Sequence, residues 1–332
     1  MKKIFVVFVV LFAVAASARN ITEKDIFKFT WIGDPQLSPD GSQIAFVRVT
    51  VDDKGDKYLT SIWSVPSKGG GDPRQITNGP RDTAPRWSPD GKTLAFLRAG
   101  EKDGKTQPGQ IQLLSMSGGE PHQLTSLPKA VESIAWSPNG KQLAFTATTK
   151  PSDFDSAAKK DKKDDEHESD VRVINQAVYR ANGAGYSDPT RSTHVWVIDA
   201  ADDAKPKQLT SGDFDEEGLA WSPDGSRIYF VSTRVNESYY DPRDSDLYAV
   251  PAAGGDVIKV SDSKGSVGRI SPSPDGKWIA YVGTVAEPIH SYTQSDIFVV
   301  PATGGEARNL TEKFDNDVMS AISTGAPGGA GA

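Results

Sequence analysis

The residue types best suited to binding a ligand lie close together near the middle of the chain. Arg180 follows Tyr179 directly, and Tyr186 comes six residues later. A guanidinium group is planar and presents its donors as a fork, so it can hold a carboxylate or carbonyl oxygen between flanking rings. Tyr179, Arg180 and Tyr186 are therefore candidate substrate-binding residues for a ligand that carries a carboxylate or carbonyl group. The alternative interpretation is packing by the tyrosines beside an ordinary surface arginine.

No arrangement of residues predicts a catalytic or metal centre. The histidines, which are His122, His167, His194 and His290, lack the spacing of metal ligands, and the absence of cysteine removes thiolate chemistry. The nearest approach to a Gly-x-Ser-x-Gly nucleophile motif is the segment 265–268, Gly-Ser-Val-Gly, whose spacing is wrong. We therefore assign no catalytic residue, no metal and no cofactor.

Two acidic segments of the sequence are typical of solvent-exposed surface. Glu216 and Glu217 precede Trp221, and we expect them in a solvated loop. Residues 151–170 carry eight acidic residues and four lysines. Apolar residues are too few there to offset the entropy of ordering, so we expect an inserted charged loop. A flexible arm that touches a partner is the alternative.

A repeat of about fifty residues organises the chain. The string Ser-Pro-Asp/Asn-Gly starts at Ser38, Ser88, Ser137, Ser222 and Ser273, with spacings of 50, 49, 85 and 51 residues. Three of these spacings agree within two residues, and the long one indicates a unit with an insertion. Proline, aspartate and glycine each favour a tight turn, so we assign the motif to turn geometry and not to a site.

Each repeat predicts four short strands. One strand ends at the turn motif, often with tryptophan just before it, and a second begins directly after it with large residues at alternate positions. A third and a fourth follow after variable loops. The expected third strands are 62–65, 111–114, 195–198, 247–250 and 297–300, and the expected fourth strands are 75–77, 123–125, 208–210, 259–261 and 309–311.

Four antiparallel strands per repeat, with tryptophan wedged between sheets, are typical of a β-propeller blade. The fold class is therefore all-β, with about five blades in residues 19–318. We expect an incomplete ring, and an open arc would leave two apolar sheet faces uncovered.

Three segments resemble a known family. Residues 21–41, residues 170–180 with Gly185-Tyr186 after them, and residues 213–225 are similar to the N-terminal propeller of prolyl-oligopeptidase-family serine peptidases. The acylaminoacyl-peptidase and dipeptidyl-peptidase branch is the most similar. The resemblance implies a propeller of seven or eight blades over an α/β-hydrolase domain with a Ser-Asp-His triad. It also implies that the propeller admits only short peptides.

The sequence departs from that plan. It has no nucleophile motif and no alternation of strands with helices, and a Gly/Ala-rich irregular tail occupies 319–332. We therefore expect a chain truncated before the catalytic domain, which gates substrate without cleaving it. Its expected partners are short peptides or the missing C-terminal hydrolase domain.

A second function remains open, because the repeat motif is shared with the propeller of the Tol–Pal envelope system. On that interpretation the chain is a stand-alone periplasmic propeller that binds a protein or peptide partner. A complete ring of five blades would favour it.

The N-terminus and the composition bear on location. Residues 1–18 have basic Lys2 and Lys3, a short apolar run and the cleavage pattern Ala16-Ser17-Ala18, which predict a signal peptide and a secreted or periplasmic protein. We expect no membrane span after cleavage. The net charge of −7 argues against nucleic acid as a partner.

Overall fold

The computed structural model describes residues 20–52, 54, 57–154, 171, 173–174, 179–181, 185–186, 188, 190–235, 244–285, 293–314 and 318. Within these residues the chain forms five four-stranded antiparallel sheets and two short hairpins. The helical elements there are two 3₁₀ turns, η1 (Glu23–Lys28) and η2 (Pro151–Phe154). The predicted signal peptide, residues 1–18, and the tail, residues 319–332, lie outside the described residues.

In each sheet the four strands lie side by side in the order in which they follow along the chain. The strands of the first two sheets are β1 (Trp31–Leu37), β2 (Gln43–Val51), β3 (Tyr58–Pro66) and β4 (Arg74–Gln75), then β5 (Asp82–Trp87), β6 (Thr93–Arg98), β9 (Gln110–Ser115) and β10 (His122–Gln123). The third sheet contains β11 (Val131–Trp136), β12 (Gln142–Ala147), β15 (His194–Asp199) and β16 (Lys207–Gln208).

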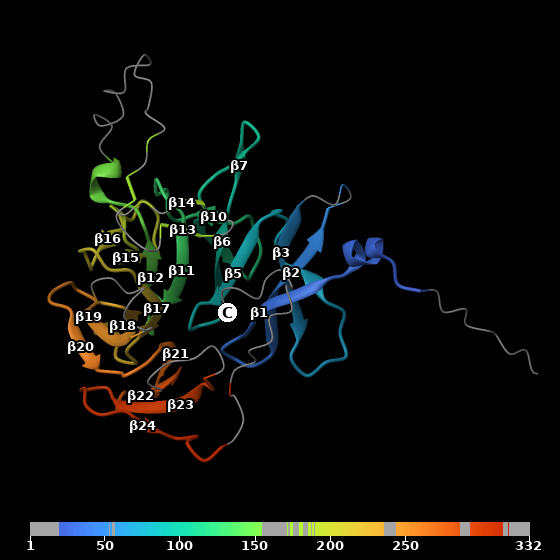
Figure 1. Ribbon diagram of the computed structural model, residues 1–332. Coiled ribbons are helices and arrows are strands. Elements are labelled where there is room, and N and C mark those ends of the chain that lie inside the picture. The colour runs from blue at the N-terminus through green and yellow to red at the C-terminus, as the bar shows by residue number, and fades with distance from the viewer. Residues whose placement is uncertain are drawn as a thin grey trace, which may run out of the picture.

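The last two sheets repeat the pattern. They contain β17 (Glu216–Trp221), β18 (Arg227–Ser232), β19 (Asp246–Pro251) and β20 (Ile258–Ser261), then β21 (Val267–Pro272), β22 (Trp278–Gly283), β23 (Asp296–Pro301) and β24 (Arg308–Asn309). Figure 1 shows the five sheets arranged in chain order around a common centre. The first strand of each sheet lies beside the first strand of the next.

The Ser-Pro-Asp/Asn-Gly motif forms the turn between the first and second strands, as predicted. In the second sheet Ser88 Oγ donates to Asp90 Oδ1 at 2.6 Å and accepts the backbone N–H of Thr93 at 2.9 Å. Gly91 adopts φ +69°, a conformation that a Cβ disfavours. The proline ring of the preceding turn, Pro39, lies 3.6 Å from where that Cβ would stand. The motif therefore closes the turn and packs neighbouring turns together.

The tryptophans before the turn join adjacent sheets. Each indole Nε1–H donates to a carbonyl oxygen of the first strand of the preceding sheet. The pairs are Trp87 to Gln36 at 3.1 Å, Trp136 to Arg86 at 3.0 Å and Trp221 to Ala135 at 3.0 Å. A buried indole needs such an acceptor, because an unpaired N–H away from water is costly. The predicted role of these residues as wedges is confirmed.

The apolar core lies between the sheets. Four clusters of buried side chains join the sheets in succession, first to second, second to third, third to fourth and fourth to fifth. The second strands of the second, third and fourth sheets are buried on both faces, as their apolar composition predicts. The all-β class and the four-stranded antiparallel units are confirmed, whereas the number of blades and the closure of the ring stay predictions.

Candidate functional site

The three predicted binding residues come together on a two-stranded hairpin. Strand β13 (Arg180–Ala181) pairs with β14 (Gly185–Tyr186), so that Arg180 lies opposite Tyr186. The Arg180 guanidinium carbon lies 5.6 Å from the centroid of the Tyr186 ring, and the rings of Tyr179 and Tyr186 are 6.2 Å apart. Gly185 supports the hairpin with φ +82°. The sequence spacing thus places one cation and two rings in a single cluster.

This cluster is open to solvent. Tyr179 is 43% exposed, Tyr186 is 49% exposed, and Arg180 is exposed as well. A guanidinium that stacks on a ring keeps the edge of its fork available, so it can donate two parallel hydrogen bonds to a carboxylate. The alternative interpretation, in which the tyrosines pack inside the fold, does not fit rings that are exposed to this extent.

Arg191 anchors the base of the insertion, which is the segment between β12 and β15 that carries the hairpin. Arg191 donates to both carboxylate oxygens of Asp153 at 2.7 Å and to the carbonyl oxygen of Thr148 at 3.2 Å. It also lies 3.3 Å from the carboxylate of Asp188. These contacts join residues on either side of the insertion, so the hairpin is held at a defined point between β12 and β15. Of the predicted charged loop, residues 155–170 lie outside the described residues.

Charge pairing lowers the pKa of the anchoring acid. The hydrogen bond from Arg191 is the largest cause, and it holds the pKa of Asp153 at about 2, against an ordinary value of 3.8. The same pair raises the pKa of the Arg191 guanidinium. Both groups therefore stay charged at neutral pH, and the pair is a fixed attachment of the insertion.

A buried acid lies at the start of β17, and the expectation of a solvated loop at Glu216 is wrong. Glu216 is 1% exposed, and its neighbour Glu217 is exposed but lies in strand β17 and not in a loop. Glu216 Oε2 accepts from Thr210 Oγ1 at 2.8 Å and lies 2.9 Å from His194 Nδ1. Arg234 Nη2 donates to Glu216 Oε1 at 2.8 Å. These partners satisfy the carboxylate, which explains why a charged side chain is tolerated there.

The arginine of this network is enclosed by aromatic rings. Its guanidinium carbon lies 4.7 Å from the ring of Tyr248 and slightly further from Phe214 and Phe230. The network joins the third sheet, through His194, to the fourth. Its contacts are those of a structural clamp.

Alignment of the repeats shows a sequence pattern that predicts this clamp. Asp82 begins β5 five residues before Trp87, just as Glu216 stands five residues before Trp221. Asp82 is fully buried, and Arg98 donates to both of its oxygens, at 2.7 and 2.8 Å. An acid at this repeat position, with an arginine at the end of the second strand or just after it, therefore indicates a buried pair and not a loop.

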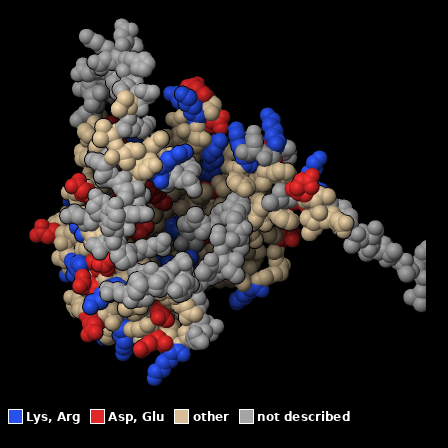
Figure 2. Space-filling view, viewed as in Figure 1, with Lys and Arg blue, Asp and Glu red and all other residues tan. Residues whose placement is uncertain are grey.

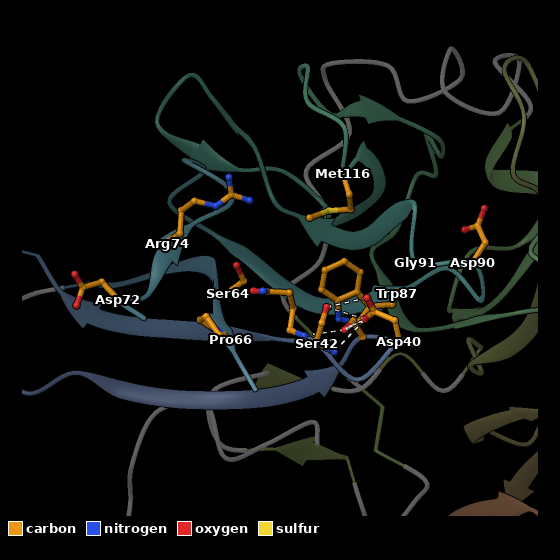
Figure 3. A pocket seen from close by; sticks show the side chains of 12 residues that line it. Asp40, Ser42, Ser64, Pro66, Asp72, Arg74, Trp87, Asp90, Gly91 and Met116 are labelled. Carbon is orange, nitrogen blue, oxygen red and sulfur yellow. Dashed lines mark hydrogen bonds between the residues drawn. The ribbon is translucent and has the colours of Figure 1, made fainter. Parts of the chain in front are cut away.

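A cleft of about 520 Å³ lies between the first and second sheets, at the turns. Figure 3 shows Trp87 beside Asp40 and Ser42, with Met116 above them and Arg74 further out. The Asp40 carboxylate is engaged by Ser38 and Ser42, and the Ser38 hydrogen bond is the main cause of its pKa of about 2. The carboxylates of Asp40 and Asp90 thus stabilise the turns, and the cleft lies at the strand ends opposite the insertion.

The described part of the chain has three further features. No group of three His, Asp or Glu residues is placed there to hold a metal ion. No helix in it is long and apolar enough to cross a membrane. Figure 2 shows acidic and basic side chains interspersed on the face in view, without a large patch of one sign.

Comparisons with known proteins point to peptidases. Residues 175–288 match the dipeptidyl peptidase IV N-terminal region. The chain is 32% identical over 229 residues to YuxL, an uncharacterized peptidase of Bacillus subtilis, covering 69% of this chain and 33% of that protein. It is 27% identical over 276 residues to dipeptidyl-peptidase 5 of Porphyromonas endodontalis, covering 79% of this chain and 38% of that protein. The chain thus spans little more than a third of these relatives.

Solved structures show the same fold. Acylaminoacyl peptidase of Pyrococcus horikoshii superposes with a TM-score of 0.62 at 22% identity, covering 89% of this chain and 42% of that one. TolB of Agrobacterium tumefaciens gives 0.53 at 20% identity, covering 84% and 80%. Stacked four-stranded sheets of this kind define a β-propeller. The chain is similar to the N-terminal propeller regions of prolyl-oligopeptidase-family peptidases.

Proposed function

We propose that the chain is the substrate-gating propeller of a secreted serine peptidase that acts on short peptides. The exposed stack of Arg180 on Tyr186, in a chain related to peptidases, is the observation that carries the proposal. The guanidinium fork binds a peptide carboxylate or carbonyl oxygen, and the two tyrosine rings contact the peptide's side chains.

The hairpin holds peptides and does not cleave them. Bond cleavage in this proposal belongs to the hydrolase domain of the complete peptidase, because the sequence has no Gly-x-Ser-x-Gly motif. Incubation of the purified chain with a fluorophosphonate probe tests this division. We expect no covalent labelling, and labelling of any serine in this chain would contradict it.

Peptide affinity tests the role of the hairpin. Fluorescence anisotropy with labelled tripeptides should show binding to the wild type, and Arg180→Leu should weaken it about tenfold or more, since a hydrogen bond to a charged group contributes about 1.5–3 kcal/mol. Arg180→Lys keeps the charge but loses the fork, so its affinity should be intermediate.

A matched control separates this site from general charge effects. Arg308 is an exposed arginine on β24 in the fifth sheet, and Arg308→Leu removes the same charge elsewhere. Its affinity should equal that of the wild type. Equal losses in Arg180→Leu and Arg308→Leu would show that binding is non-specific electrostatic attraction, and the proposal would fail.

A stand-alone protein-binding propeller is the second candidate. It is favoured by the structural likeness to TolB, since the chain matches 80% of that protein but 42% of the acylaminoacyl peptidase. This candidate predicts that short peptides do not bind and that one folded partner co-purifies with the wild type. Peptide binding that is lost in Arg180→Leu would favour the peptidase propeller over the stand-alone propeller.

Secretion is part of the same proposal. It rests on the apolar segment and small-residue pattern of residues 1–18. Expression of the full chain in a bacterial host, followed by N-terminal sequencing of the periplasmic fraction, should give a protein that begins at Arg19. Recovery of the intact N-terminus from the cytoplasm alone would contradict it.

A further inference from the structure

Asparagine precedes glycine at three places in the chain, at 78–79, 139–140 and 182–183. Such a pair is chemically labile, because glycine has no side chain to keep its backbone nitrogen away from the amide carbon of the asparagine. The pairs at 78–79 and 139–140 lie within the described residues, whereas the third pair lies outside them. The first two therefore allow a comparison within one molecule.

The side chain of Asn139 is fixed in the turn of the third sheet. Its Oδ1 accepts from Ser137 Oγ at 2.8 Å and from the backbone N–H of Lys141 at 2.9 Å. The N–H of Gly140 donates to the carbonyl oxygen of Ser137 at 2.9 Å. Attack by the Gly140 nitrogen on the amide carbon of Asn139 requires that these hydrogen bonds break, so the fold protects this pair.

Asn78 lies in the connector, which we define as residues 76–81 between β4 and β5. Its side chain is exposed and makes no hydrogen bond to the described residues. The N–H of Gly79 donates to Asp82 Oδ2 at 3.1 Å. A carboxylate at this distance can take a proton from the donor. The Asn78 side chain is thus free to turn towards a backbone nitrogen whose proton already has an acceptor.

Close packing explains why glycine stands at position 79. A Cβ on this residue would clash with the carboxylate of Asp82. Asp82 is fully buried and accepts two hydrogen bonds from Arg98, at 2.7 and 2.8 Å, so it cannot move aside at low cost. The chemical lability of this pair therefore follows from the packing around a buried acid.

We propose that Asn78 is a site of spontaneous deamidation in the folded protein. The Gly79 nitrogen attacks Asn78 Cγ and forms a C–N bond, while the side-chain nitrogen leaves as ammonia with the proton that Gly79 has lost. Water then opens the cyclic imide at either of its carbonyl carbons. The product is aspartate or isoaspartate at position 78, and both add a carboxylate to the small pocket that Asn78 and Arg98 line.

Isoaspartate at this position should loosen the connector, because hydrogen bonds hold the chain on both sides of it. On one side Thr77 Oγ1 accepts the N–H of Ile62 at 3.0 Å. On the other side the carbonyl oxygen of Pro80 accepts the N–H of Thr60 at 2.9 Å. Isoaspartate inserts a methylene group into the backbone between these two points, so both bonds cannot keep their geometry. Modified chains should therefore unfold at a lower concentration of urea.

Timed incubation of the full chain at neutral pH, in buffer and in concentrated guanidinium chloride, tests the proposal. Trypsin places the two pairs on separate peptides, 75–81 and 130–141, and mass spectrometry measures the fraction in which the amide has become a carboxyl group. In denaturant both asparagines should react at similar rates. In the folded chain Asn139 should react more than about tenfold slower than in denaturant, whereas Asn78 should react at least as fast as it does there.

Asn78→Gln is the matched control, because glutamine keeps the amide but holds it one methylene group further from the Gly79 nitrogen. After incubation the wild type should lose more stability in a urea titration than Asn78→Gln does, and any change at 182–183 is common to both chains. An Asn78 that reacts as slowly as Asn139 in the folded chain would overturn the proposed site. Equal losses of stability in the two chains would overturn its effect on the connector.

Discussion

Arg234 Nη2 lies 2.8 Å from Glu216 Oε1 in a pair whose carboxylate is almost wholly buried. Removing Arg234 leaves Glu216 with Thr210 and His194 as its remaining partners, and breaking a buried ion pair costs about 3–5 kcal/mol. Arg234→Met should therefore lower the free energy of unfolding by about 3 kcal/mol, as measured by urea titration.

The double variant Glu216→Leu/Arg234→Met provides the control for this pair. It removes both charges together, so its loss of stability should be clearly smaller than the sum of the two single losses. Additive losses would show that the two side chains contribute independently and that the pair is not a clamp.

The indole of Trp136 should contribute both packing and one hydrogen bond. Trp136→Phe removes the bond to the carbonyl oxygen of Arg86 and should cost about 1 kcal/mol, while Trp136→Ala should cost about 3–5 kcal/mol. Leu37 occupies the same repeat position in the first sheet but is largely exposed, so Leu37→Ala should cost well under 1 kcal/mol. Equal losses at Leu37 and Trp136 would contradict the wedge role. Thermal unfolding followed by circular dichroism measures each.

Much of the fold could be predicted because its determinants are local and repeated. The turn motif supplies its own hydrogen bonds, as Ser88 and Asp90 show, and the alternating residues of the second strands predict burial on both faces. Because the turn motif and the strand pattern recur along the chain, both can be recognised in a single sequence. The proximity of Tyr179, Arg180 and Tyr186 could also be predicted, because they lie within eight residues of one another, whereas their role in peptide binding stays a prediction.

The Glu216 clamp escaped prediction because its partners are distant in the sequence. His194 lies 22 residues before Glu216 and Arg234 lies 18 residues after it. A glutamate beside another glutamate and near glycine favours a solvated loop when it is judged locally. Burial was decided by tertiary partners that compensate the charge, and no local pattern reports those partners.

The anchor of the insertion should depend on pH in the acid range. The pKa of Asp153 is lowered from 3.8 to about 2, so the pair with Arg191 stabilises the fold fully above 3.8, and that contribution is lost as the pH falls towards 2. Asp153→Asn cannot titrate. The stability difference between the wild type and Asp153→Asn should therefore shrink over this interval, as measured by urea unfolding at successive pH values. A constant difference would contradict the assignment.

The most direct test of peptide binding by this propeller is to locate a bound peptide. A tripeptide that carries a photoreactive side chain is cross-linked to the wild-type chain, and the modified residues are mapped by mass spectrometry. The account predicts labels within residues 179–186 that unlabelled peptide competes away and that Arg180→Leu loses. Labels concentrated in the cleft lined by Asp40 and Trp87, or labels that persist in Arg180→Leu, would contradict it.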